Sequence, residues 1–194
     1  MESVIGSFDV VKSLPLARWK VVTKYGDLKE FGFPCYLKAD VAGHKSELGA
    51  VVRLDSLEDA EKKLQKMHRD FPKNRIIIQE AFDGIEMIVG LKNDEVFGKI
   101  LVVGFGGIFA EVKRDVSFRA LPVTRSDIIE MIKELKSVEV FRARGNNYDL
   151  EKFVTLVEKI SYLGDKIYIK ELDLNPVIVG KKDSKIVDAR VELE

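Results

Sequence analysis

Apolar residues along the chain fall into short runs separated by polar or glycine-containing segments, a pattern typical of strands joined by turns. Several runs are rich in β-branched residues, most clearly the run at 75–80. The pattern predicts strands at 20–23, 34–39, 49–54, 75–80, 85–91, 96–103, 168–179 and 185–191, with further strand-like residues up to Val123.

Apolar residues at helical spacing predict three helices between these strands. The first begins with a capping-box-like segment at 56–59 and ends at Pro72. Its buried face consists of Leu57, Ala60, Leu64, Met67 and Phe71. Two further helices are expected at 126–136 and 149–163, and the segment 142–147 between them has the composition of a loop.

Two pairs of consecutive strands are expected to form antiparallel hairpins. Residues 92–95 form a polar turn between the strands at 85–91 and 96–103, and residues 180–184 form a turn in the last hairpin. Antiparallel hairpins with interspersed helices predict an α+β fold rather than a doubly wound parallel sheet.

Composition narrows the possible environments and partners. Among 194 residues, 32 basic residues balance 32 acidic ones, so the chain has no overall positive field for nucleic acid. The one cysteine, Cys35, excludes an internal disulfide and fits a reducing cytoplasm. The N-terminus does not resemble a signal peptide, and no apolar run reaches the roughly 20 residues of a membrane span. We expect a cytoplasmic protein that binds neither membranes nor nucleic acid.

The segment 38–49 combines groups that suit a polyphosphate. Lys38 ends a strand, and a small-residue loop that contains His44 and Lys45 follows. Backbone N–H groups in such loops and lysine ammonium groups bind phosphoryl oxygens, and a neutral imidazole is also a nucleophile. The alternative interpretation is a solvated loop with ordinary surface lysines and a hydrogen-bonded histidine.

The segment 79–90 has features of a nucleoside site. Strand-end backbone at 80–82 can hydrogen-bond an adenine edge, with Phe82 beside it, and Glu86 can accept hydrogen bonds from ribose hydroxyls. Alternatively, Glu80 and Glu86 are ordinary charges at strand edges.

Two further groups of residues complete the candidate site. With the last turn centred near Lys182, Asn175 lies opposite residue 189 and Asp188 opposite residue 176, close enough to present two oxygens to one Mg²⁺. The alternative is an Asn-Pro turn and a surface aspartate. The glycine-rich segment 104–107 matches neither a Rossmann nor a P-loop pattern, and Arg119 beyond it is the most plausible further phosphate-binding cation.

The motifs follow one another along the chain as Leu37-Lys38, His44-Lys45-Ser-Glu, Gln79-Glu80 with Gly84 and Glu86, Gly106-Gly107 with Glu111 and Asp115 to Arg119, Glu171 to Pro176, and Val187 to Arg190. In this order they resemble the ATP-grasp β subunit of NDP-forming acyl-CoA synthetases, and more distantly succinyl-CoA synthetase β. The match runs from about Leu14 to the C-terminus. The chain departs from the family pattern in a short segment at 24–33 and in Ala50, where a second glycine is common.

The resemblance implies an ATP-grasp fold, with lobes at 1–80 and 81–194 enclosing a nucleotide cleft. By position, Lys38 matches the phosphate-contacting lysine, and Glu80 and Phe82 match the adenine-side hinge. Glu86 matches the ribose carboxylate, and Asn175 and Asp188 match the Mg²⁺ ligands. His44 matches a histidine proposed to relay phosphate between an α-subunit phosphohistidine and ADP.

The implied reaction is acyl-CoA + ADP + phosphate ⇌ carboxylic acid + ATP + CoA. Its CoA-binding and acyl-phosphate modules belong to a separate α subunit, so a hetero-oligomer is expected. The alternatives are a degenerate ATP-grasp module with a regulatory or assembly role, and an ATP-grasp ligase of another substrate class. The latter needs an acceptor site of its own, for which the chain offers no evident carboxylate- or amine-binding cluster.

Overall fold

The computed structural model describes residues 3–41, 48–107, 115–145, 147–166 and 169–193. Contacts between residues divide the chain into two compact units. The smaller unit consists of Ser3–Ile5 and Ala17–Ala81, and the larger unit contains Gly6–Leu16 and Phe82–Glu194. The short helix α1, Val4–Val10, contributes residues to both units.

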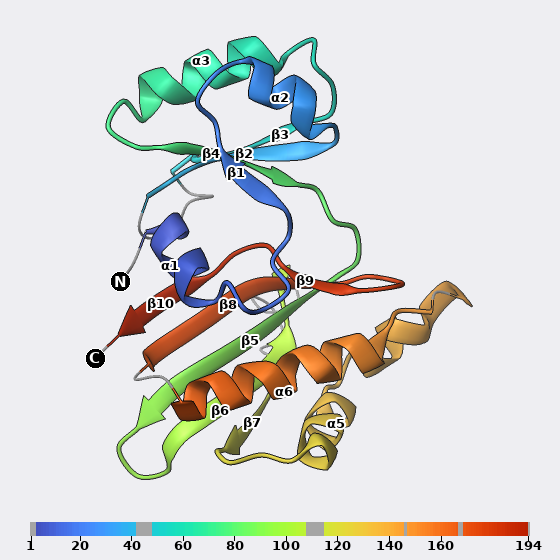
Figure 1. The fold of residues 1–194 in the computed structure, drawn as a ribbon. Coiled ribbons are helices and arrows are strands. Elements are labelled where there is room, and N and C mark those ends of the chain that lie inside the picture. The colour runs from blue at the N-terminus through green and yellow to red at the C-terminus, as the bar shows by residue number, and fades with distance from the viewer. Residues whose placement is uncertain (1–2, 42–47, 108–114, 146, 167–168, 194) are drawn as a thin grey trace. The chain divides into compact units, whose positions relative to one another are not determined.

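The smaller unit contains a four-stranded antiparallel sheet in the order β1-β4-β2-β3 (Figure 1). Its strands are β1 Trp19–Val21, β2 Cys35–Ala39, β3 Val51–Leu54 and β4 Ile76–Glu80. Each strand lies within a few residues of its predicted position. The apolar residues that predict the strands are the ones that their core-facing sides bury.

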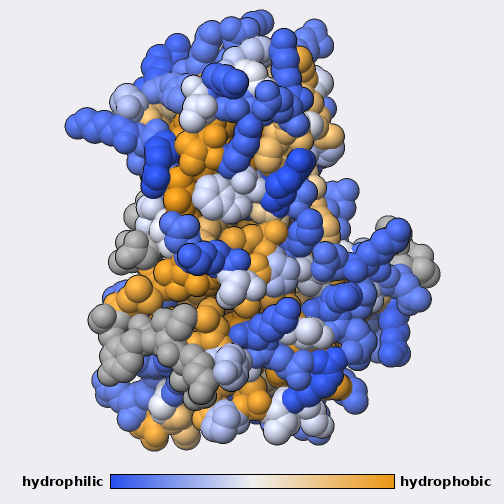
Figure 2. Space-filling view, in the orientation of Figure 1, coloured by the Kyte–Doolittle hydropathy of each residue, from blue (hydrophilic) through white to orange (hydrophobic). Residues whose placement is uncertain are grey.

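Two helices cover one face of this sheet (Figure 1): α2, Gly26–Phe31, and α3, Ala60–Asp70. The core between helices and sheet includes Leu28, Leu37, Leu54, Leu64, Met67, Ile76 and Ile78. The exposed side of α3 carries Glu61, Lys62, Lys66 and Arg69. In the view of Figure 2, the surface around these helices is accordingly mostly hydrophilic.

The larger unit contains a six-stranded antiparallel sheet in the order β10-β8-β5-β6-β7, with β9 also paired to β8. Its strands are β5 Ile85–Asp94, β6 Gly98–Phe105, β7 Val116–Ala120, β8 Ile169–Val179, β9 Ser184–Ile186 and β10 Arg190–Leu193. The predicted hairpin of β5 and β6 is present.

Three helical segments accompany this sheet (Figure 1): α5 Arg125–Glu134, the 3₁₀ segment η1 Val138–Gly145, and α6 Leu150–Lys166. Buried Phe105 of β6 and Phe141 of η1 pack with ring centroids 5.4 Å apart. Thr124 caps α5 in a reciprocal arrangement with Asp127. No helix in the described ranges is long and apolar enough to span a membrane.

Four local expectations differ from the structure. The segment 142–147, expected as a loop, lies partly within η1. The polar segment 24–33 contains the short helix α2. The first predicted helix begins at Ala60, and Asp59 makes no side-chain cap, so the capping box at 56–59 does not form. The last predicted strand is two strands, β9 and β10, separated by residues 187–189.

Candidate functional site

Lys38 lies on the face of β2 that points away from the helices of the smaller unit. Its neighbours Leu37 and Ala39 belong to the core, so alternation places Lys38 on the other face. It is paired in register with Val51 of β3 and Ile77 of β4, and only 7% of its surface is exposed. Lys38 is thus held, largely buried, on the non-helical face of this sheet.

The predicted nucleophile and its neighbouring cation, His44 and Lys45, lie outside the described residues. Within the described ranges the one histidine is His68, which is exposed on α3. Burial raises the pKa of the Cys35 thiol to about 11, so this cysteine does not provide a thiolate nucleophile at neutral pH.

The structure modifies the expected adenine hinge at 80–82. The Glu80 carboxylate accepts a hydrogen bond from the Arg18 backbone N–H at 2.8 Å, and the Arg18 guanidinium lies 3.8 Å away. The backbone N–H of Glu80 donates to Arg18, and that of Ala81 donates to Pro34. The N–H groups of Glu80 and Ala81 are therefore already bonded, which leaves the backbone of Phe82 as the remaining N–H of this segment.

The Phe82 ring packs on the last hairpin of the larger unit. A Cβ atom on Gly180 would lie 3.0 Å from the ring, so glycine allows this approach. The Lys185 ammonium lies 5.0 Å from the ring centroid, within cation–π distance. The hairpin thus orients Phe82, a relation that the sequence does not reveal because it depends on which residues the turn brings together.

Glu86 is exposed on β5 and lies beside the glycine-rich segment that follows β6. Its carbonyl accepts a hydrogen bond from Gly106 N–H at 2.8 Å. A Cβ on Gly107, whose φ is +56°, would lie 2.6 Å from the Glu86 carboxylate oxygen Oε2. Gly106 and Gly107 therefore make room for the predicted ribose-binding carboxylate.

Asn175 and Asp188 lie opposite each other. Val177 of β8 pairs with Ile186 of β9, and Asp173 pairs with Arg190 of β10. Four residues separate the two pairs on each side, so Asp188 stands opposite Asn175. The predicted offset of one residue was wrong: the observed register places the two residues at directly opposing positions.

The Asn175/Asp188 pair fits a hard divalent cation. Asn175 is exposed and Asp188 half-buried, and they contribute amide and carboxylate oxygens, the donors that Mg²⁺ prefers. The described residues contain no group of three or more His, Cys, Asp or Glu that could hold a metal alone. Mg²⁺ in nucleotide sites usually takes one or two protein oxygens, and water and phosphate oxygens complete its coordination. The two oxygens of this pair agree with that arrangement.

Arg119 on β7 is engaged in an ion pair. Its guanidinium binds the Glu134 carboxylate of α5, with one N–H···O distance of 3.1 Å, and Glu134 raises the Arg119 pKa. Ser117 also donates to Glu134, at 2.6 Å. Phosphate binding by Arg119 would therefore compete with this internal pair.

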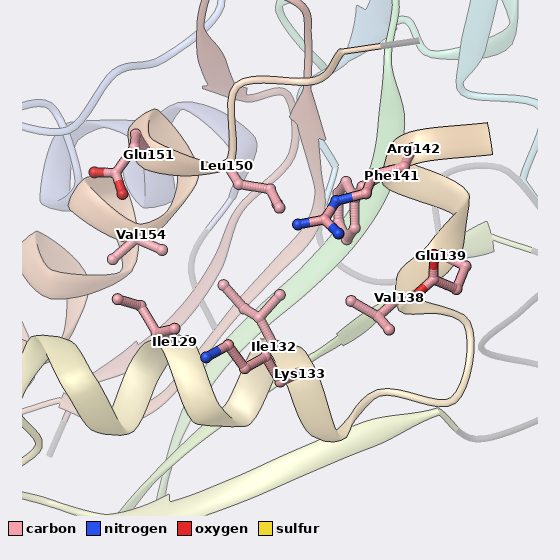
Figure 3. A pocket seen from close by; sticks show the side chains of 10 residues that line it. All are labelled: Ile129, Ile132, Lys133, Val138, Glu139, Phe141, Arg142, Leu150, Glu151 and Val154. Atoms are coloured by element: carbon pink, nitrogen blue, oxygen red, sulfur yellow. The ribbon is translucent and has the colours of Figure 1, made fainter. Parts of the chain in front are cut away.

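A separate pocket of about 450 Å³ lies between α5, η1 and α6 (Figure 3). Figure 3 shows the charged groups of Lys133 and Arg142 among apolar side chains that include Ile132 and Phe141. The lining residues are Ile129, Ile132, Lys133, Val138, Glu139, Phe141, Arg142, Leu150, Glu151 and Val154. None of the predicted site residues lines this pocket.

Comparisons with known proteins agree with the geometry. A family model described as an ATP-grasp domain matches residues 20–193. The β subunit of the ADP-forming acetate–CoA ligase II of Pyrococcus furiosus is 37% identical over 188 residues, covering 88% of this chain and 79% of that subunit. The ADP-forming acetate–CoA ligase II of Archaeoglobus fulgidus is 38% identical over 170 residues, and the match spans 84% of this chain but only 25% of that longer protein.

A solved structure is also similar over the whole chain. It is the dinucleotide-forming acetyl-coenzyme A synthetase 1 of Ca. Korarchaeum cryptofilum, in complex with coenzyme A and Mg-AMPPCP. The TM-score is 0.86 at 33% identity, and the match covers 100% of this chain and 93% of that one. In that complex a phosphohistidine segment points towards the nucleotide binding site. The predicted α+β ATP-grasp fold is confirmed, and the chain belongs to the ATP-grasp domain family, with relatives named as β subunits of ADP-forming acetate–CoA ligases.

Proposed function

We propose that the chain is the nucleotide-binding β subunit of an ADP-forming acyl-CoA synthetase. In this proposal Lys38, Lys45 and Arg119 bind phosphates, while Glu80 and Phe82 flank the adenine and Glu86 binds the ribose. The observation that carries the proposal is the register of the last hairpin, which brings Asn175 and Asp188 opposite each other. This pair suits Mg²⁺ bound to a nucleotide, and such a cation would neutralise phosphoryl oxygens during transfer.

His44 is proposed to carry the phosphoryl group between two sites. One of its ring nitrogens attacks the phosphorus of an α-subunit phosphohistidine, a P–N bond forms, and the former P–N bond breaks. A proton passes from the attacking imidazole to the leaving one. A terminal oxygen of ADP then attacks the phosphorus on His44, which releases the imidazole and, with uptake of a proton, forms ATP. Covalent transfer keeps the group from water between the two sites.

The partner in this proposal is an α subunit that carries the CoA-binding and acyl-phosphate chemistry. Two facts about relatives support it: the P. furiosus relative is named as a β subunit, and the A. fulgidus relative is about four times as long as the matched segment. The complete ligase would thus be a cytoplasmic hetero-oligomer.

The test is phosphoryl transfer in the assembled enzyme. Co-purification would identify the α subunit, and ATP-dependent acyl-CoA formation would then be measured with wild type, His44→Ala and the control His68→Ala. His68 is exposed on α3, so its replacement should leave the rate unchanged. We expect His44→Ala to lose at least about 99% of activity, in line with removal of a covalent nucleophile. Full activity in that variant would remove His44 from the relay.

A different measurement separates the alternative in which the module only regulates or assembles the enzyme. Isothermal titration calorimetry of the chain with ADP, with and without Mg²⁺, should give Mg²⁺-dependent binding. Absence of binding under both conditions would favour a degenerate ATP-grasp module.

A further inference from the structure

Gln79 on β4 has a buried amide donor without a partner. Its surface is 1% exposed, and Nε2 makes no hydrogen bond. Within the described ranges only one other buried side-chain atom, Ser184 Oγ, is in this state. An unsatisfied buried donor costs roughly 1–3 kcal/mol. A bound ligand that supplies a hydrogen-bond acceptor would remove this cost, so the unsatisfied donor favours ligand binding.

The surroundings of Gln79 suit a planar aromatic ligand. Gln79 is paired with Tyr36 of β2 on one side and with Trp19 of β1 on the other. Opposite residues of antiparallel strands share a face, so Gln79 lies between two strands that each present an aromatic residue on its own face of the sheet. Ile76 and Ile78 belong to the core of the smaller unit, which places Gln79 on the same non-helical face as Lys38.

The order of residues along β2 and β4 separates a phosphate end from a base end. Lys38, the lysine expected to bind phosphate, pairs with Ile77. In the opposite direction Tyr36 pairs with Gln79, and Cys35 pairs with Glu80, where the hinge segment begins. Gln79 is therefore next to the hinge, and Lys38 lies towards the other end of β2. Arg53 of β3 lies opposite Tyr36 on the same face, where its guanidinium donates to the Asp55 carboxylate.

We propose that Gln79 reads the adenine base: Nε2 donates to the ring nitrogen N7, and the amide oxygen accepts from the 6-amino group. A glutamine amide matches this edge of adenine with one donor and one acceptor. Guanine presents two acceptors there, N7 and O6, so the same amide satisfies only one of them. Gln79 thereby favours adenine over guanine nucleotides. This inference rests on the proposed nucleotide-binding function and adds base specificity to it.

The experiment combines a variant with an altered base. Dissociation constants of Mg-ADP, Mg-7-deaza-ADP and Mg-GDP would be measured by calorimetry for wild type, Gln79→Met and Gln65→Met. Gln65 is the matched control, since it is exposed on α3 and undergoes the same chemical change. Unfolding in urea would be followed for each protein.

We expect Gln79→Met to bind ADP roughly 5- to 100-fold more weakly, the range for loss of a bidentate base contact. Wild type should prefer ADP over 7-deaza-ADP, which lacks the N7 acceptor, and the variant should not distinguish them. The ADP/GDP preference should fall in the variant. Its stability should be unchanged or higher, because an apolar side chain of similar shape removes the unsatisfied donor.

Each outcome has one interpretation. Equal wild-type affinity for ADP and 7-deaza-ADP, or unchanged ADP affinity in Gln79→Met, overturns the role of Gln79 while leaving the proposed function intact. The 7-deaza comparison needs only wild-type protein, so it decides the question even where the variant fails to fold. No ADP binding by wild type contradicts the proposed function itself.

Discussion

At the scale of single residues, Asp27 is the most strongly engaged carboxylate of the smaller unit. It is 6% exposed and accepts hydrogen bonds from Lys20 Nζ at 2.8 Å, from the backbone N–H of Thr23 and Lys24, and from the Thr23 hydroxyl. The Lys20 hydrogen bond, followed by those of the backbone, holds the Asp27 pKa well below its usual range. The ionised carboxylate thus ties β1 to the start of α2.

Replacing Asp27 by Asn should lower stability at neutral pH and hardly at all in strong acid. A depressed folded-state pKa contributes stability that is present above the unfolded pKa, about 3.9 for Asp, and is lost as pH falls towards the folded value. The gap in unfolding free energy between wild type and Asp27→Asn, measured by urea titration, should therefore be constant above about pH 5 and narrow below pH 4. The exposed Asp9→Asn is the control, and a pH-independent gap for Asp27→Asn would contradict this explanation.

Residue types with clear chemistry could be found from the sequence, but their partners could not. The sequence predicts site roles for Lys38, Glu86, Asn175 and Asp188, because their side chains suit phosphate, ribose or Mg²⁺. The pairing of Glu80 with Arg18 and of Arg119 with Glu134 joins residues that are 62 and 15 positions apart. Gln79 belongs to the Gln79-Glu80 motif, but the sequence did not indicate a role for its side chain, because only the structure shows that its amide donor is buried without a partner.

At the scale of elements, the last hairpin differs from its predicted register because its turn is shorter. Gly180 N–H donates to the Asp183 carbonyl at 2.9 Å, so Lys181 and Lys182 alone form the connection. A turn centred on Lys182 would have had an odd number of residues and shifted every pair by one. The two-residue turn instead sets Asn175 against Asp188.

This register predicts a specific effect of Asp188→Asn on Mg²⁺-dependent binding. The amide keeps the size and one oxygen but removes the negative charge that attracts the cation. We expect the Kd of ADP in the presence of Mg²⁺ to rise at least about tenfold, comparable to the loss for altered metal-site residues. ADP binding in EDTA should stay the same as in wild type. An equal loss with and without Mg²⁺ would instead indicate a disturbed hairpin.

The start of β5 depends on a glycine. Gly84 lies against β8, where an added Cβ would be 2.3 Å from the Val179 carbonyl oxygen. Gly84→Ala must displace backbone, and we expect a loss of about 1–3 kcal/mol in unfolding free energy, typical of overpacking. ADP affinity should fall as well, because Glu86 follows two residues later. At Gly26 an added Cβ would make only ordinary van der Waals contact, 3.7 Å from Lys24 Cε, so Gly26→Ala serves as the control. Equal stability of both variants would refute the close packing at Gly84.

Long periodic elements were predictable and short helices were not. The strands and the helices α3, α5 and α6 carry apolar residues at regular spacing, which reports the buried face directly. Helices α1 and α2 have only seven and six residues, too short for a periodic pattern, and they form because tertiary contacts stabilise them. In α2, for example, Leu28 and Phe31 are buried in the core of the smaller unit.

At the scale of the whole chain, the order of motifs predicted the family, although each motif alone allowed an ordinary structural interpretation. Chain order did not predict that residues 6–16 group with the larger unit. Contacts far apart in sequence cause this grouping: Ile186 N–H donates to the Pro15 carbonyl, and Val191 N–H donates to the Ser7 hydroxyl. Such contacts leave no local pattern of apolar and polar residues.

The proposed division of labour between subunits predicts what the isolated chain can do. With Mg-ATP it should form phosphohistidine on His44 and exchange label between ADP and ATP, because these steps need only the nucleotide and the relay. It should not form acyl-CoA, since the acyl and CoA chemistry is assigned to the α subunit. Acid-labile, alkali-stable label from γ-³²P-ATP would be measured for wild type, His44→Ala and His68→Ala. Label in wild type and His68→Ala but not in His44→Ala agrees with the relay, whereas label that persists in His44→Ala places the phosphoryl group on another residue.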